Sequence, residues 1–235
     1  MTGVLGAFVP PPGRVHLAGP AAAILVTHLP GGNDTNGAPA GLVVVAAVVP
    51  DLVAPGALAV APIAAGRVGF RLVIQGRAAA YATTPHAARQ DPVLTVARLI
   101  DLADRMARAR GVGCFSCVGE VNFGMAVAGA IPDQASITLW FDHLSATELA
   151  RLAAQFPREA GFVARDAATQ LTVDSTWTLA PLAADPAIIA ALRAAGGGKF
   201  GDIILPRALD DSGLDDAIPR LFIGLGDAAL NTTTA

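Results

Sequence analysis

The sequence predicts a protein of mixed α/β plus α+β structure, whose central part has the element order β-α-β-β-α-β. Three observations predict this class. Residues 69–75 alternate β-favouring and polar side chains and stop at Gly76, as a half-buried strand does. Residues 92–109 carry an apolar stripe with helical spacing. Ser145 precedes Glu148 by three positions, the pattern of a capping box at a helix start. Together these elements predict one antiparallel sheet covered by two helices.

Shorter apolar runs predict the remaining elements. In the central part they indicate strands at residues 118–122, 136–142 and 170–174. Further along they indicate a helix at 186–195, which three glycines end, and buried strands at 203–205 and 221–223. The first 20 residues hold three consecutive prolines, so we expect them to be irregular or to form an edge strand.

Composition narrows the classes of protein that the chain can belong to. With 235 residues it can bury one large core or two small ones. Its apolar runs near 21–26 and 41–49 are well short of the roughly 20 residues that a membrane-spanning helix needs. A net charge of -3 with scattered arginines provides no basic surface for nucleic acid. No secretory signal opens the chain, and we therefore expect a soluble, cytoplasmic protein that binds neither membrane nor nucleic acid.

The two cysteines, Cys114 and Cys117, are spaced as C-x-x-C before a predicted strand. A structural zinc site would need a second pair of ligands, and a redox pair usually opens a helix. We therefore expect two free thiols in the core. Free thiols fit a reducing compartment.

A family resemblance rests on the run from Gly76 to Asp91, G-R-A-A-A-Y-A-T-T-P-H-A-A-R-Q-D. It resembles the G-x-x-x-H-A-G-T-T-P-x-x-x-R-x-D signature of the lid, or dimerisation, domain in zinc-dependent aminoacylase and exopeptidase-type hydrolases. N-carbamoyl amino acid and allantoate amidohydrolases are the most similar branch. The later runs V-G-E-V-N, A-I-P-D-Q-A and L-W-F-D-H fall where that family has T-V-G, N-x-I-P and D-x-R.

The resemblance implies an architecture and an assembly. It implies a ferredoxin-like lid domain at residues 68–175, inserted into a reduced three-layer α/β domain of the catalytic type at residues 1–67 and 176–235. In the family the lid pairs two protomers, so we expect a homodimer.

The resemblance also implies a zinc site, but this sequence departs from the family at the ligands. His28 matches the first ligand, whereas Pro30 stands in place of an aspartate and cannot ligate a metal. Asn36 is the best match to the bridging aspartate, and Asp34 is the nearest carboxylate. Residues 50–69 contain neither the glutamate nor the histidine of the family's H-I-E-Q-G motif. Because catalytic zinc takes three protein ligands, we predict no metal and no other cofactor.

Three further departures lie in the predicted lid. Ala80 stands where the family has a histidine that reaches across the dimer, and Gly129 where it has an asparagine. Asp142 stands where the family has the arginine that holds the substrate carboxylate. Since a carboxylate cannot bind a carboxylate in this way, we expect anionic amino-acid substrates to be rejected.

The candidate site residues are polar side chains that the resemblance places near the cleft. Asp142 is a candidate general acid or base, or else a solvated charge at a strand end. His28 is a candidate catalytic residue, or else a hydrogen-bonded structural one. Tyr81 either presents its hydroxyl to a ligand or packs its ring on the lid helix. The candidate substrate-binding residues are Asp34, Asn36 and His86. For His86 the alternative interpretation is a helix cap or a solvated side chain.

Three functions are compatible with these features. The first is a metal-independent enzyme of specialised metabolism. It would use the cleft that corresponds to the family's active site for cyclisation, isomerisation or amide chemistry on a small organic substrate. The second is a non-catalytic pseudo-hydrolase that binds a partner. The third is a zinc amidohydrolase with displaced ligands. The sequence contains neither a P-loop nor a Gly-x-Ser-x-Gly elbow, and it names no substrate.

Overall fold

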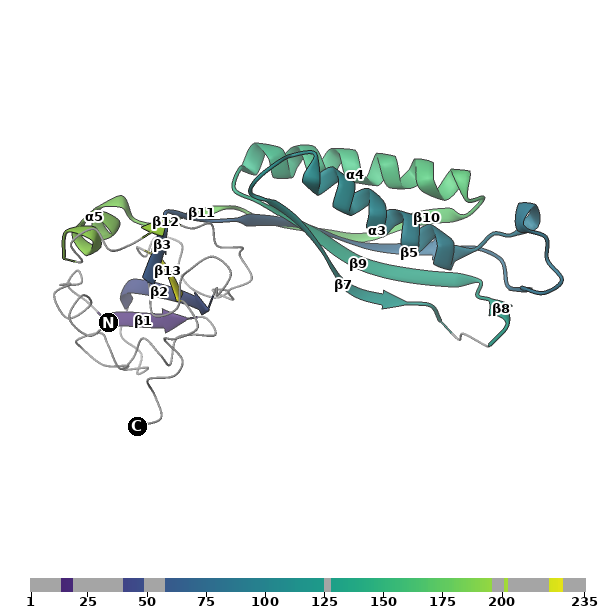
Figure 1. Ribbon diagram of the computed structural model, residues 1–235, viewed down its shortest axis with the longest axis horizontal. Coiled ribbons are helices and arrows are strands. Elements are labelled where there is room, and N and C mark those ends of the chain that lie inside the picture. Colours follow the sequence, from purple (N-terminus) through teal and green to yellow (C-terminus); the bar gives the residue numbers. More distant parts are fainter. Residues whose placement is uncertain are drawn as a thin grey trace. The chain divides into compact units, whose positions relative to one another are not determined.

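The computed structural model describes residues 14–18, 40–48, 58–124, 128–195, 201–202 and 220–225 (Figure 1). The chain divides into two compact units. One unit is Gly66–Pro181, and the other combines Met1–Ala65 with Leu182–Ala235.

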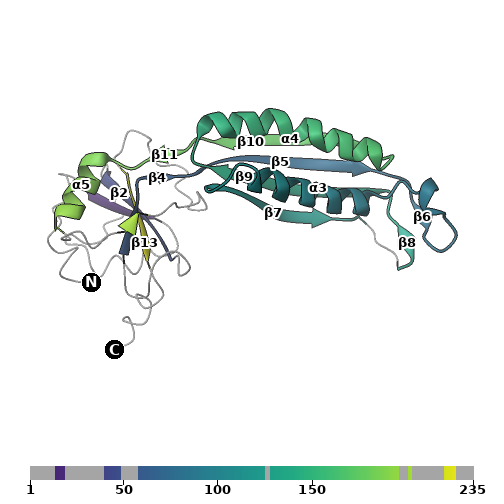
Figure 2. The same cartoon turned by 45° about the horizontal axis from the view of Figure 1, so that its top comes forward.

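The unit Gly66–Pro181 is one antiparallel sheet with two helices on one face, as Figure 2 shows. Its main elements are β5 (Gly66–Gln75), α3 (Pro92–Arg108), β7 (Cys114–Asn122), β9 (Gln134–His143), α4 (Ala146–Asp166) and β10 (Gln170–Leu179). The strands lie in the order β10-β5-β9-β7. A short 3-10 helix, η1 (His86–Ala88), follows β6 (Ala79–Ala80), which pairs with β8 (Ala130–Ile131). The predicted mixture of helices and sheet is confirmed, although the strands extend further than the sequence indicated.

The core of this unit lies between the sheet and the two helices. Every second residue of β5 from Val68 to Ile74 is fully buried, because alternate side chains of a strand point to the same face. Phe156 of α4 packs against Phe70 and Phe141, with ring centroids 5.0 and 5.2 Å apart. No helix of the described part of this unit lies over the opposite face of the sheet. We call that face the open face.

Helix α3 is capped by Asp91. Asp91 accepts hydrogen bonds from the backbone N–H groups of Val93 and Leu94, and Pro92 occupies the first helical position. Thr95 of α3 also bonds the hydroxyl of Thr169, at a distance of 3.0 Å, and both side chains are buried. The start of α3 is thereby tied to the turn that follows α4.

The capping box predicted for α4 is only half formed. The N–H of Glu148 donates to the hydroxyl of Ser145, as expected. The N–H of Ser145 donates instead to Nδ1 of His143, at 2.9 Å, and the Glu148 carboxylate binds Arg151. The reciprocal half was wrong, because the charged guanidinium of Arg151 is a stronger hydrogen-bond donor to the Glu148 carboxylate than a backbone N–H is.

The C-terminus of α4 forms a Schellman motif. The N–H of Thr169 donates to the carbonyl of Ala164, and that of Ala168 to the carbonyl of Arg165. Ala168 has a φ of 53°, a value at which most helices place glycine. A methyl group therefore sits where the left-handed backbone is strained.

The second unit is built on a five-stranded mixed sheet in the order β1-β2-β13-β3-β12. Its elements are β1 (Arg14–Ala18), β2 (Ala40–Val48), β3 (Leu58–Ala61), β12 (Gly201–Asp202) and β13 (Arg220–Leu225), with α5 (Pro186–Ala195) and the pair β4 (Ile63–Ala64) and β11 (Leu182–Ala183). Strand β13 is parallel to β2 and antiparallel to β3. The predicted helix at 186–195 and strand at 221–223 are confirmed, whereas the strand predicted at 203–205 lies outside the described residues. In the described part of the chain, no helix has the length and apolar character to cross a membrane.

Candidate functional site

A buried ion pair joins two neighbouring strands on the open face of the sheet. Arg67 of β5 and Asp142 of β9 are direct partners in the antiparallel ladder. The guanidinium Nε and Nη2 donate to the two carboxylate oxygens at 2.7 and 2.8 Å. Only 6% of the Asp142 side chain and 18% of the Arg67 side chain are exposed. Two parallel, charge-assisted hydrogen bonds of this kind fix the guanidinium in one orientation.

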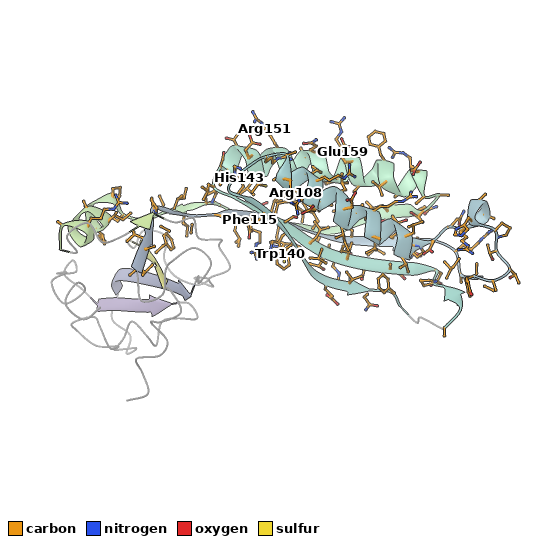
Figure 3. All side chains as sticks on the ribbon, in the orientation of Figure 1. Arg108, Phe115, Trp140, His143, Arg151 and Glu159 are labelled. Atoms are coloured by element: carbon orange, nitrogen blue, oxygen red, sulfur yellow. The ribbon has the colours of Figure 1, made fainter. Side chains whose placement is uncertain are left out.

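The indole ring of Trp140 packs against the guanidinium of this ion pair. The Cζ atom of Arg67 lies 4.7 Å from the ring centroid of Trp140, within the range of a cation–π contact. In Figure 3, Trp140 lies on the side of the sheet away from α3 and α4. The second tryptophan, Trp177 of β10, faces the same side, because it pairs with Gly69, which in turn pairs with Trp140.

This arrangement changes the chemistry expected of Asp142. The sequence suggested a carboxylate free to act as general acid or base. In the structure both of its oxygens accept hydrogen bonds from Arg67, so proton transfer would require the pair to open. Sequence reasoning missed Arg67, because it lies 75 residues from Asp142 and only the strand register brings the two together.

Tyr81 and His86 lie at the other end of the same unit. Tyr81 follows β6, and its side chain is 58% exposed, so its ring does not pack into the core. His86 is in η1 and is exposed, with Nδ1 3.4 Å from Nη1 of Arg89. Arg89 also donates to the carbonyl oxygens of Thr84 and Tyr81, and thereby holds the loop together.

The structure does not bring Asp142 together with Tyr81 or His86. Arg67, the partner of Asp142, is the second residue of β5, whereas Tyr81 comes after the last residue of that strand. At about 3.3 Å per residue, the strand alone separates them by roughly 25 Å. Within one chain, these residues cannot act on the same small substrate.

A cavity of about 380 Å³ opens beside His86. Its lining includes Arg89, Asp91, Arg98, Asp166 and Ala168. The charged groups of this lining already have structural partners: Asp91 caps α3, and Arg98 binds Asp166 at 2.9 Å. The cavity is therefore a surface hollow whose charges are used to join α3 to the end of α4.

The other three candidate residues, His28, Asp34 and Asn36, lie outside the described residues. Among the residues that the structure does describe, no three His, Cys, Asp or Glu side chains gather where they could hold a metal ion.

The two cysteines are free, but only one is in the core. Cys114 is buried and Cys117 is exposed, so the expectation of two core thiols was half wrong. The reason is the strand itself: positions three apart on β7 face opposite sides of the sheet. Burial raises the pKa of the Cys114 thiol, which keeps it protonated.

Comparison with known proteins supports the resemblance at the level of the fold. No protein-family model matches the chain, and no curated protein sequence matches it. Among solved structures, hydantoinase/carbamoylase-family amidases superpose well on it. The amidase from Burkholderia ambifaria gives a TM-score of 0.69 at 17% identity, covering 83% of this chain and 49% of that one. The amidase from Burkholderia vietnamiensis gives 0.68 at 23% identity, covering 81% and 48%. The amidase from Burkholderia multivorans gives 0.68 at 20% identity, covering 86% and 50%.

The likeness therefore covers most of this chain but only about half the length of each amidase. At these identities it shows the fold alone: the chain has the fold of about half of a hydantoinase/carbamoylase-type amidase.

Proposed function

We propose that the chain is a metal-independent enzyme on an amidohydrolase-type scaffold, which acts on a small organic substrate by cyclisation, isomerisation or amide chemistry. One observation carries the proposal. The chain superposes on amidases over more than four fifths of its length, yet its sequence has a proline where the family has a second metal ligand. An amidase fold without a zinc-binding set supports chemistry that the side chains perform themselves.

Of the residues matched to the family's zinc ligands, two do not fit a zinc site. His28 is followed at the ligand position by Pro30, which has no donor atom, and the bridging position is held by Asn36, a neutral amide. Catalytic zinc is held by three imidazole, carboxylate or thiolate ligands. No step of the proposed reaction is therefore routed through a metal.

In this proposal Arg67 and Asp142 act together. Arg67 supplies a charged hydrogen-bond donor, which would stabilise negative charge that develops on a carbonyl oxygen. Asp142 is its positioning residue, because it fixes the guanidinium through two hydrogen bonds. His28 is proposed as the group that moves a proton, with Asp34 and Asn36 as substrate-binding residues.

We further propose that Gly66–Pro181 is a ferredoxin-like lid domain through which two copies form a homodimer. Its outer strands β7 and β10 each have one edge without a partner strand in this sheet, and such edges are prone to pair with another copy. Because Tyr81 lies roughly 25 Å from Asp142 in one chain, the two would share a site only if Tyr81 came from the second copy. We expect this dimer to be cytoplasmic.

The test uses the purified full chain. Its metal content is measured, and it is then assayed against a panel of uncharged amides, lactams and cyclic ureas, together with the variants His28→Ala and Asp142→Asn. We expect a metal-free protein that turns over at least one member of the panel, with loss of turnover in both variants. Stoichiometric zinc would favour a zinc amidohydrolase with displaced ligands, and full activity in both variants would remove the proposed site.

A second function, that of a non-catalytic binding protein, is favoured by one specific observation. Both oxygens of Asp142 are occupied by Arg67, so the most buried carboxylate of the described residues is not free for proton transfer. This alternative predicts no turnover of any panel member together with stoichiometric, saturable binding of a partner molecule.

A further inference from the structure

We propose that the open face around Arg67 binds a planar, uncharged group that carries a carbonyl oxygen, such as a carboxamide, lactam or urea. The inference deepens the proposed function by naming the ligand class, but it concerns binding and not turnover. We call this surface the tryptophan face. It consists of Arg67, Gly69, Gly119, Trp140, Asp142 and Trp177.

Two glycines make room for the two indole rings. A Cβ atom at Gly69 would lie 2.1 Å from the Trp177 ring, and one at Gly119 would lie 2.3 Å from the Trp140 ring. Real Cβ atoms do not come so close to a ring, so any other residue at either position would push the indole away from the sheet. Each indole ring therefore lies close over the backbone of its glycine, on the face where a planar ligand would stack.

The guanidinium of Arg67 is preorganised for ligand binding, because its neighbours hold it in one orientation. It is stacked on Trp140 and held by Asp142, so little side-chain freedom remains to be lost on binding. Its hydrogen bonds to described residues use Nε and Nη2, which leaves the donors of Nη1 for a ligand oxygen. A planar ligand with a carbonyl oxygen can accept a hydrogen bond from Nη1 of Arg67 and stack on an indole ring at the same time.

The balance of charge on this face favours an uncharged ligand. The charge of Arg67 is matched by Asp142, and that of Arg71 by Asp174 at 3.6 Å. Glu120 of β7 pairs with Thr138 in the ladder and therefore adds a negative charge to the same face. An anion would meet no net positive charge here, whereas a neutral carbonyl needs only the hydrogen bond.

The experiment measures binding of benzamide and of benzoate, its anionic counterpart of the same shape, to the full chain. The chain has two tryptophans, so isotope-labelled tryptophan gives two indole N–H signals in an NMR spectrum, and both report on this face. We expect benzamide to shift both signals saturably, and benzoate to bind on the order of ten-fold more weakly.

Two variants test the contacts. In the double variant R67Q/D142N an amide pair replaces the ion pair, so that no buried charge is left alone, and benzamide affinity should fall by about ten-fold. Gly119→Ala should displace the Trp140 ring and weaken binding by a similar factor. The matched control is Gly161→Ala in α4, where the new Cβ would lie 3.5 Å from Arg165 and affinity should be unchanged.

Unmoved indole signals at millimolar benzamide, equal affinity in R67Q/D142N, or tighter binding of benzoate would each overturn the inference. Far-ultraviolet circular dichroism confirms that each variant is folded. A chain that binds benzamide as expected but turns over no substrate would refute the proposed enzyme and keep this inference, so the two failures are distinguishable.

Discussion

The ion pair between Arg67 and Asp142 should contribute measurably to the stability of its unit. We expect Arg67→Gln to cost about 3 kcal/mol, because it leaves a carboxylate buried without a cationic partner. Asp142→Asn should cost about 2 kcal/mol, since the guanidinium left behind can still reach water. If both partners were fully buried, removing either one would cost roughly 3 to 5 kcal/mol. The 18% exposure of the Arg67 side chain places the expected costs at or below the lower end of this range.

A double-mutant cycle isolates the interaction energy of the pair. The variant R67Q/D142N should be destabilised by only about 2 kcal/mol, so that the coupling energy is about 3 kcal/mol. The assay is urea unfolding of the full chain, followed by tryptophan fluorescence. A matched control is the pair Arg105–Asp101 on α3, whose side chains are 64% and 65% exposed. There R105Q/D101N should show a coupling of about 0.5 kcal/mol or less.

A coupling at Arg67–Asp142 as small as that of the exposed pair would refute the reasoning. It would mean that water reaches the pair freely and that Asp142 is available as a base. Loss of activity in Asp142→Asn with no loss of stability would lead to the same conclusion.

Four other predictions follow from packing and burial. Ala168→Gly should raise stability by about 1 kcal/mol in thermal unfolding, because it removes the strain of a left-handed alanine. Phe156→Ala, at the centre of the aromatic cluster, should cost about 3 to 5 kcal/mol in urea unfolding, whereas Phe162→Ala, on the same helix and 58% exposed, should cost far less. At neutral pH, iodoacetamide should alkylate Cys117 alone, as mass spectrometry would show. Because burial raises the pKa of Cys114 above its ordinary value of 9.0, its contribution to stability is complete below that pH and declines above it, a decline that Cys114→Ala should abolish.

The elements with strong local signals could be predicted from the sequence. The stripe at residues 92–109 predicted α3 to within one residue, since burial of one helix face sets its period. The helix at 186–195 was predicted with its observed bounds, because a proline begins it and glycines follow it. The predicted strands that fall on described residues were in place but too short. Their ends are set by ladder partners and not by local composition.

The candidate site was less predictable, because its main contacts depend on register. Arg67 has no local signal, and it meets Asp142 only because β5 and β9 pair at that position. The contacts of Gly119 with Trp140 and of Gly69 with Trp177 also depend on register, since each glycine and its ring lie on different strands. A signal was nonetheless present. Glycine at 69, inside a strand that otherwise favours large side chains, often marks a close approach by another group.

The tryptophan face has a spectroscopic consequence. Tyr81, Trp140 and Trp177 are all the tyrosine and tryptophan residues of the chain, and all three belong to Gly66–Pro181. Absorbance at 280 nm and tryptophan emission therefore originate in that unit. An unfolding curve recorded by emission monitors one half of the molecule, and agreement with a backbone signal such as far-ultraviolet dichroism would show that both halves melt as a single cooperative system.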